Sequence, residues 1–355
     1  MQYDYLIIGQ GLAGSCMALQ LLQEDKKILV IDEPHPNTSS MIAAGIFNPI
    51  TGRKMVKTWK ADQLFPYLKT FYLQAEKELK SNFFHQINIY RPFIDTEVQN
   101  EWMGKSASAE HQSYVEKVHL NSEFPNDLHD EYGGLELKNA GYIDLPVFIN
   151  SVRLLLKQKG CYVENKFDED KLILENGAVK YESFTSKKVI LCNGDQSAHS
   201  NLFGWLPFSL VKGEILEISV PKLPTVIYNR GVFILPKKNN KCRVGATYDQ
   251  NDLTNNVTDK ARKALVEKLN GVYRSEYNIV NQVAGIRPAS RDRRPFIGIH
   301  PNYPEIGIFN GLGAKGVSLA PYFSKQFVQM LEHGTELDDE VNINRYKSIY
   351  YSNID

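Results

Sequence analysis

The sequence has few of the features that mark a membrane protein, a secreted protein or a metalloprotein. No apolar run approaches the ~20 residues of a membrane-spanning helix. The 355 residues include only four cysteines. No two of them form a C-x-x-C pair, which argues against a disulfide framework or a zinc site and fits a reducing compartment. The eight histidines are scattered, without the spacing of metal ligands or of a catalytic triad, so we predict no metal site.

An excess of one charge is also missing, because Lys+Arg and Asp+Glu both number 41. Nothing global therefore attracts DNA or an anionic membrane, and a nucleic-acid partner is not expected. The first predicted strand starts almost at Met1, which leaves no room for a signal peptide, and we expect a cytoplasmic protein. A chain of 355 residues is too long for one simple core, which favours two domains.

A glycine-rich turn near the N-terminus is the first positive indication of function. The apolar residues 5–8 predict a strand that runs into IIGQGLAGS, and helical periodicity follows. In such a turn Gly9 allows the tight bend, Gly11 lets the backbone approach a pyrophosphate, and Gly14 lets helix and strand pack closely. A second strand, KILVID, ends on Asp32, where an acid should meet a ribose hydroxyl. The pattern predicts a bound dinucleotide.

Three later segments, SSMIAAG, VILCNGD and GLGAKGVSLAP, indicate which dinucleotide is bound. A nicotinamide dehydrogenase usually completes its doubly wound sheet in one continuous block. Here the N-terminal unit is interrupted, and strands that end in glycine return near Gly194 and Gly311. FAD is longer than NAD and lies extended, so it needs backbone contacts from several distant segments. The order of these segments favours FAD.

With these motifs the chain resembles the FAD-dependent oxidoreductases of the D-amino-acid oxidase family, and most of all the glycine oxidase and sarcosine oxidase branch. The resemblance covers nearly the whole chain, is most specific in AGIRPASRDRRPFIG and FNGLGAKGVSLAP, and is weak over residues 81–139. It implies an α/β (α+β overall) fold. A discontinuous Rossmann-like FAD-binding domain would comprise residues 1–80, 140–206 and 285–355. A mostly antiparallel β-sheet substrate domain would comprise residues 81–139 and 207–284.

The resemblance also implies which residues contact FAD. The serines would cap a helix and touch the phosphates; capping alone is the alternative. A helix starting near Val317 would point its positive end at the flavin and stabilise a reduced, anionic ring. The implied residues are Gly9, Gly11, Leu12, Ala13 and Gly14 at the pyrophosphate, Asp32 and Glu33 at the ribose, Ser39 and Ser40, Ala44, Gly45 and Ile46 along the ring, Phe167 near the adenine, Asn193 and Gly194, Arg287, and Gly311, Leu312, Gly313, Ala314, Lys315, Gly316 and Val317 around the pyrimidine side.

Arg287 is the main substrate candidate, because the branch uses an arginine at this place to pair with the substrate carboxylate, and a guanidinium fork matches a carboxylate. Where the branch often has a carboxylate-binding tyrosine, this chain has Phe233; Tyr248 would supply a hydroxyl or only pack. The stretch that carries the flavin-attaching cysteine in sarcosine oxidases has none here, so the resemblance implies noncovalent FAD.

The implied activity is oxidation of an amine or amino acid by hydride transfer to FAD, with oxygen or another electron acceptor reoxidising the cofactor. Three alternatives stay open. They are an oxidase of a modified tRNA base, motivated by the basic GRKMVKTWK stretch, a 2-hydroxyacid or glycerol-phosphate dehydrogenase, and a non-catalytic flavoprotein. The sequence does not decide the exact substrate, the acceptor or whether the chain forms a homo-oligomer.

Overall fold

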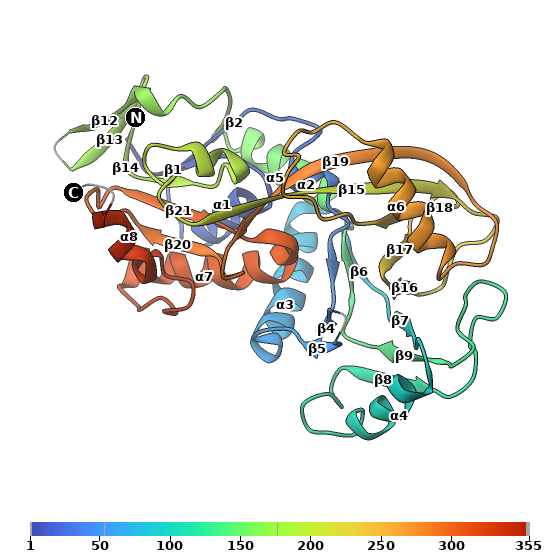
Figure 1. Ribbon diagram of the computed structural model, residues 1–355. Helices are drawn as coiled ribbons and strands as arrows, with labels where there is room; N and C mark the ends of the chain where they lie inside the picture. The colour runs from blue at the N-terminus through green and yellow to red at the C-terminus, as the bar shows by residue number, and fades with distance from the viewer. Residues whose placement is uncertain (1, 53, 176, 353–355) are drawn as a thin grey trace.

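The computed structural model describes residues 2–52, 54–175 and 177–352, and it builds them around two large sheets (Figure 1). The first sheet has the order β11-β2-β1-β14-β13-β12, and β21 pairs with β14 and with β20. Strands β11, β2, β1, β14 and β21 run parallel to one another, whereas β13 pairs antiparallel with β14 and β20 pairs antiparallel with β21. Their bounds are β1 Gln2–Ile8, β2 Ile28–Asp32, β11 Tyr162–Glu164, β12 Leu172–Glu175, β13 Ala178–Tyr181, β14 Phe184–Leu191, β20 Phe296–Ile299 and β21 Ile306–Asn310.

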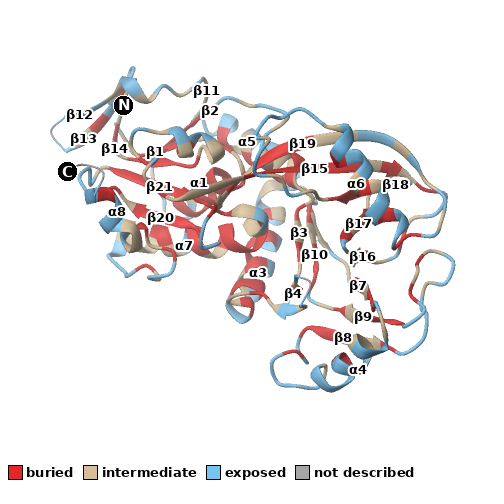
Figure 2. Ribbon diagram, in the orientation of Figure 1, coloured by how far each residue is buried: buried red, intermediate tan, exposed pale blue. Residues whose placement is uncertain are grey.

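The carboxyl-terminal halves of β1 and β14, and nearly all of β2 and β21, are buried and mostly apolar because both faces of the sheet are covered there. On β1, Ile7 packs into one core cluster while Leu6 and Ile8 pack into another. Helices α1 (Leu12–Gln23), α5 (Leu145–Gln158) and α7 (Gly316–His333) pack together on the Ile7 side. Figure 2 shows this buried centre and the more exposed outer elements. The sequence-based α/β fold is therefore confirmed.

The second sheet has the order β19-β15-β18-β17-β16-β7-β9-β8 and is antiparallel except for the β16–β7 pair. Helix α6 packs against β15, β17 and β18. The predicted domain boundary at residues 284/285 lies inside β19, which pairs with β15 along its length. The bounds are β7 Ile89–Pro92, β8 Val115–His119, β9 Gly134–Leu137, β15 Phe208–Ser219, β16 Ile227–Arg230, β17 Val232–Pro236, β18 Lys241–Gly245, β19 Asn278–Ser290 and α6 Asp259–Asn270.

Short elements connect the two large sheets. A three-stranded antiparallel sheet has the order β3-β10-β6, and β4 and β5 form a hairpin. Helix α3 packs against α7 and α5. Among the described residues, no helix has both the length and the apolar character that crossing a bilayer requires. The bounds are α2 Ser39–Ile42, β3 Ile46–Phe47, β4 Ile50–Thr51, β5 Val56–Lys57, α3 Ala61–Leu79, β6 Phe84–Gln86, α4 Thr96–Lys105, β10 Gly141–Ile143 and α8 Lys347–Ser352.

Candidate active site

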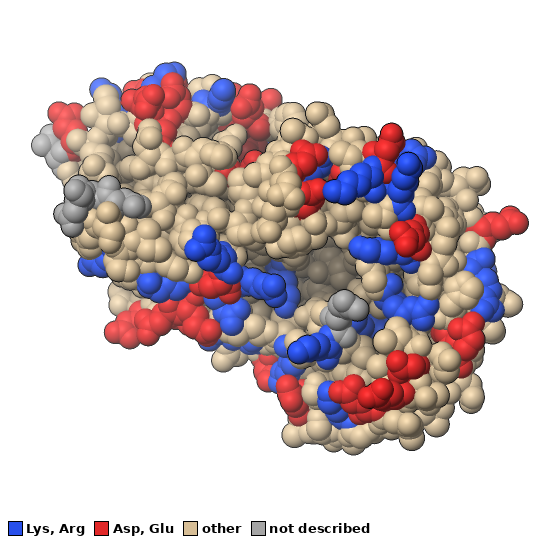
Figure 3. Space-filling model, viewed as in Figure 1, with Lys and Arg blue, Asp and Glu red and all other residues tan. Residues whose placement is uncertain are grey.

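A cavity of about 470 Å³ lies between the two large sheets. One wall is formed at the carboxyl ends of β1, β2 and β14 and by the turn before α7, where open α/β sheets usually bind their ligands. The other wall is formed by residues of β15, β17 and β19. On the face shown in Figure 3 the molecule is hollowed between its two lobes, with Lys and Arg side chains on several sides of the hollow.

The turn between β1 and α1 has the shape that a pyrophosphate needs. Gly9 has a φ of 92°, and a Cβ on Gly14 would lie 1.8 Å from the Gly9 carbonyl oxygen, so that position has no room for a side chain. A Cβ on Gly11 would meet only the Ser40 side chain, with Oγ 3.0 Å away. As the N-cap of α1, Gly11 has no side chain of its own to cap the first-turn N–H groups. These features suit an anion at the positive end of α1.

The two serines that follow β2, Ser39 and Ser40, line the cavity but do not cap α2. Thr38 is the N-cap of α2 and accepts from the Met41 N–H, so the expected capping by Ser39 and Ser40 is wrong. Ser40 instead accepts a hydrogen bond from the Leu12 N–H at 3.0 Å. It thereby ties α2 to the glycine turn, and both serines line the cavity.

Asp32 lies in the cavity wall at the end of β2. Its Oδ1 accepts a hydrogen bond from the Gln10 N–H at 2.8 Å, and its Oδ2 accepts one from the Tyr162 hydroxyl at 3.3 Å. Arg153 reaches the same Oδ2 at 3.5 Å. The carboxylate is therefore held in place on the cavity wall.

The end of the cavity near Gly45 and the start of α7 is formed largely by backbone, and a side chain at Gly45 would collide with neighbouring backbone atoms. Gly45 has a φ of 72°, and a Cβ there would lie 2.1 Å from the Ile143 carbonyl oxygen. Helix α7 begins at Gly316, without a side-chain cap, after a 3-10 turn over Gly313–Lys315. The predicted helix start near Val317 is thus confirmed to within a residue.

Two cationic side chains reach this end of the cavity. Burial lowers the pKa of the Arg287 guanidinium, which donates to the Thr247 carbonyl at 3.2 Å. Burial, with added repulsion from Arg294 and Arg293, lowers the pKa of Lys315, whose Nζ lies 3.3 Å from the Thr51 Oγ1. Among the residues that the structure describes, neither cation forms an ion pair with a carboxylate. The site therefore favours a bound anion.

Most of the predicted residues come together in this one cavity, including Phe167, Asn193, Gly194 and Arg287. Gly14 and Gly311 do not line the cavity. Gly14 packs directly on the Gly9 carbonyl. Gly311 has a φ of 71°, and a Cβ at this position would collide with Phe296. Tyr248 does not line the cavity and is 69% exposed, although it lies close enough to Arg287 to oppose the lowering of that guanidinium's pKa.

Several lining residues were not found from the sequence. Gly213 offered a weak signal, a glycine inside an otherwise apolar strand. Asn310 stands directly before Gly311 in the FNGLGAKG motif, whereas Asn229 and the residues of the β4 hairpin offered no signal because they reach the cavity only through long-range packing. The residues missed include Phe47, Asn48, Thr51, Thr58, Asp195, Gln196, Gly213, Ile215, Asn229, Ala246, Gly285, Asn310 and Ser318.

The fold and the site define an α/β oxidoreductase that binds a dinucleotide, with a second sheet closing the cavity. The particular family follows from comparison with known proteins. The model of the FAD-dependent oxidoreductase family (DAO) matches residues 4–330, and the chain belongs to that family. FAD is therefore the cofactor, and the elongated cavity, the side-chain-free turn at Gly11 and the held Asp32 fit it.

The curated relatives are distant. The bifunctional protein ThiO/ThiG of Trichormus variabilis is 23% identical over 340 residues, which cover 90% of this chain and 51% of that protein. The uncharacterized oxidoreductase YurR of Bacillus subtilis is 23% identical over 364 residues, with 94% and 96% covered. A tRNA 5-methylaminomethyl-2-thiouridine biosynthesis bifunctional protein MnmC of Legionella pneumophila is 24% identical over 327 residues, with 84% and 46% covered. The chain spans about half the length of the bifunctional relatives.

Solved structures share the fold at low identity. Glycine oxidase from Bacillus cereus superposes with a TM-score of 0.78 at 18% identity, covering 94% of this chain and 96% of that one. Iminodiacetate oxidase from Chelativorans sp. BNC1 superposes with a TM-score of 0.81 at 20% identity, covering 97% and 98%. These likenesses extend over both sheets of the chain.

The first prediction is that FAD is bound without a covalent bond. Cys192 lines the cavity, but burial raises the pKa of its thiol and keeps it protonated, which makes it a poor nucleophile. The purified protein should be yellow, and acid or heat should release all of its FAD into the supernatant. Flavin absorbance that stays in the washed precipitate would contradict this prediction.

The second prediction separates the two roles of glycine in the turn. Gly11→Val should keep the fold but lose FAD, because Gly11 has a negative φ and the new side chain enters the space where the pyrophosphate would lie. Gly14→Ala should instead destabilise the protein, since its Cβ would collide with the Gly9 carbonyl. Flavin content and circular dichroism of both variants test this. Normal flavin content in Gly11→Val would overturn the assignment.

Proposed function

We propose that the protein oxidises an amine or amino acid whose carboxylate is held by Arg287. The observation that carries the proposal is a partly buried guanidinium in the cofactor cavity that bonds one backbone carbonyl and, in the described part of the chain, no carboxylate. A substrate carboxylate would supply the missing negative charge and accept two parallel N–H bonds. The named glycine and iminodiacetate oxidases with this fold act on substrates of this kind.

Gly213 supports the same proposal, because it makes room for the guanidinium. Arg287 lies on β19 opposite Val211 of β15, and Gly213 is the next residue of β15 on that face. A Cβ on Gly213 would lie 1.9 Å from Arg287 Nη2. The glycine thus allows the side chain to lie flat across β15 and to reach the cavity.

The residues beside Arg287 would orient the substrate and exclude water. Phe233 and Ile215 line the cavity on this side and carry no hydrogen-bonding side-chain group. With the carboxylate fixed, the carbon that bears the amine faces the end of the cavity formed by Ala44, Gly45 and Gly316. FAD, when bound, supplies the two-electron acceptor for the hydride. The substrate amine would react in its neutral form, and loss of the hydride from the adjacent carbon would leave an iminium ion. Water would hydrolyse this ion to a carbonyl compound and release the nitrogen as ammonium or as a protonated amine.

A second candidate is oxidation of a modified tRNA base. It is favoured by the cations at the mouth of the cavity, where Lys315 lies near Arg293 and Arg294, and by the named tRNA-modifying relatives. The balanced net charge argues against it. The two candidates separate in one screen, in which anaerobic bleaching of the flavin is measured with amino acids, N-methyl amines, hydroxy acids and unfractionated tRNA.

The third prediction concerns Arg287. Loss of one partner of a buried charge pair costs ~2–5 kcal/mol, so Arg287→Ala should weaken binding of an acidic amine by about 30-fold to several thousand-fold. Arg287→Lys should fall between the alanine variant and the wild type, because lysine keeps the charge but loses the fork. Rates of anaerobic flavin reduction across substrate concentration measure this. The matching amine without a carboxylate is the control, and equal losses for acid and amine would assign Arg287 to the fold or to the flavin.

The fourth prediction concerns Gly213. Gly213→Ala should displace the Arg287 guanidinium and weaken binding of the acidic amine, while FAD content stays normal because Gly213 lies on the wall that faces the substrate. Gly104→Ala on α4 is the matched control, since nothing lies within 4 Å of its added Cβ. Wild-type affinity in Gly213→Ala, measured by the same reduction assay, would show that the guanidinium does not need this space.

A further inference from the structure

Two buried charges on β15 have no part in the site described so far. Lys212 and Glu214 flank Gly213, and their side chains are 1% and 3% exposed. Successive residues of a strand point to opposite faces. Because Gly213 and Ile215 face the cavity, Lys212 and Glu214 lie on the far face of the sheet, where α6 packs. Burial of a lysine is costly unless it is paired, so this arrangement calls for a reason.

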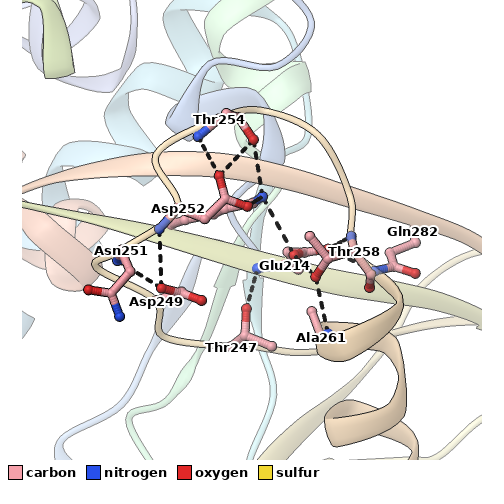
Figure 4. Close-up of polar contacts among 10 residues, drawn as sticks. Glu214, Thr247, Asp249, Asn251, Asp252, Thr254, Thr258, Ala261 and Gln282 are labelled. Carbon is pink, nitrogen blue, oxygen red and sulfur yellow. Dashed lines mark hydrogen bonds and ion pairs between the residues drawn. The ribbon is translucent and has the colours of Figure 1, made fainter.

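Most partners of the two charges come from the segment 246–258 that joins β18 to α6, and Gln282 of β19 also donates to Glu214 at 2.7 Å (Figure 4). Lys212 Nζ donates to Asp252 Oδ2 at 2.5 Å and lies 3.7 Å from Glu214 Oε1. Glu214 accepts from the Thr258 N–H at 2.9 Å and from the Thr258 hydroxyl at 2.8 Å. Thr258 is also the N-cap of α6. The two charges therefore fix the middle and the end of the segment.

Thr247, at the start of the same segment, is hydrogen-bonded to Arg287. The Thr247 carbonyl accepts from Arg287 Nη1, while the Thr247 Oγ1 accepts from the Glu214 N–H at 2.8 Å. Two residues later, Asp249 exchanges backbone hydrogen bonds with Lys212 in both directions, at 2.7 and 3.0 Å. The carbonyl that accepts from the guanidinium is thus part of a segment that the backbone of Lys212 and Glu214 holds at Thr247 and Asp249 and that their side chains hold at Asp252 and Thr258.

We propose that Lys212, Glu214 and Asp252 are positioning residues, which set the affinity for the substrate carboxylate by holding the 246–258 segment and, through Thr247, the guanidinium of Arg287. The inference rests on the proposed function of Arg287. Residues 212–214 of β15 would then act on Arg287 from both faces of the sheet. Gly213 leaves room for the guanidinium on the cavity face, and Lys212 and Glu214 hold the 246–258 segment on the opposite face.

The test uses the FAD-loaded enzyme and the variant Asp252→Asn, which removes the charge that pairs with Lys212 but keeps the size of the side chain. Asp249→Asn is the matched control, because the Asp249 carboxylate accepts only from the Asn251 and Asp252 N–H groups of its own segment. Anaerobic flavin reduction is measured with glycine and N-methylglycine and with their counterparts without a carboxylate, methylamine and dimethylamine. Asp252→Asn should weaken apparent binding of the acids by about tenfold, with the limiting reduction rate and the amine kinetics unchanged. Asp249→Asn should behave as wild type.

A crystal structure of FAD-loaded Asp252→Asn gives a readout that needs no turnover. The expected result is a shifted 246–258 segment and a guanidinium that has left the Thr247 carbonyl. An unmoved Arg287, unchanged acid affinity, or equal losses for acid and amine would each overturn the positioning role. The Arg287→Ala variant, assayed beside it, separates the two hypotheses. If Arg287→Ala loses acid binding and Asp252→Asn does not, only the positioning role fails. If Arg287→Ala binds the acids as tightly as the wild type does, the proposed function fails.

Discussion

A charged guanidinium inside the cofactor cavity is the constraint around which the second sheet is built. Removing Arg287 from water costs free energy that the single hydrogen bond to the Thr247 carbonyl does not return. Gly213 must remain a glycine for the side chain to lie where it does. Lys315 adds a second, partly desolvated cation to the same space. A bound anion would offset the desolvation of these two cations, and this is why we propose that the Arg287 charge serves substrate recognition and not stability.

The cofactor half of the site could be predicted from the sequence because its requirements are local. Gly9, Gly11 and Gly14 lie within one turn, and the contact that excludes a side chain at Gly14 is with Gly9 itself. The start of α7 follows from the glycines just before it. The same locality explains the error at α2, where Thr38 and the two serines are equally good caps by residue type and only the backbone conformation decides between them.

The substrate half could not be predicted to the same extent, because its requirements are set by long-range strand pairing. The reason for Gly213 is Arg287, which is distant in sequence and is brought near it by the β15–β19 register. Tyr248 looked suitable by residue type, but the segment after β18 turns its side chain to solvent. The predicted domain boundary at residues 284/285 falls inside β19 for a related reason. An apolar pattern indicates a strand, but it does not indicate the sheet to which that strand belongs.

Strand β19 also explains how substrate and cofactor can keep a fixed distance. Along its length it pairs with β15, and just beyond Arg287 a bridge joins Ala289 to Leu312 in the turn before α7. The residue expected to hold the carboxylate is therefore two positions from a backbone contact with the turn expected to hold the flavin. A hydride moves only between atoms in near contact, so small errors in this distance are costly. A site on a paired strand holds such a distance better than one on a free loop, which gives the interruption of the dinucleotide-binding domain by the second sheet a chemical purpose.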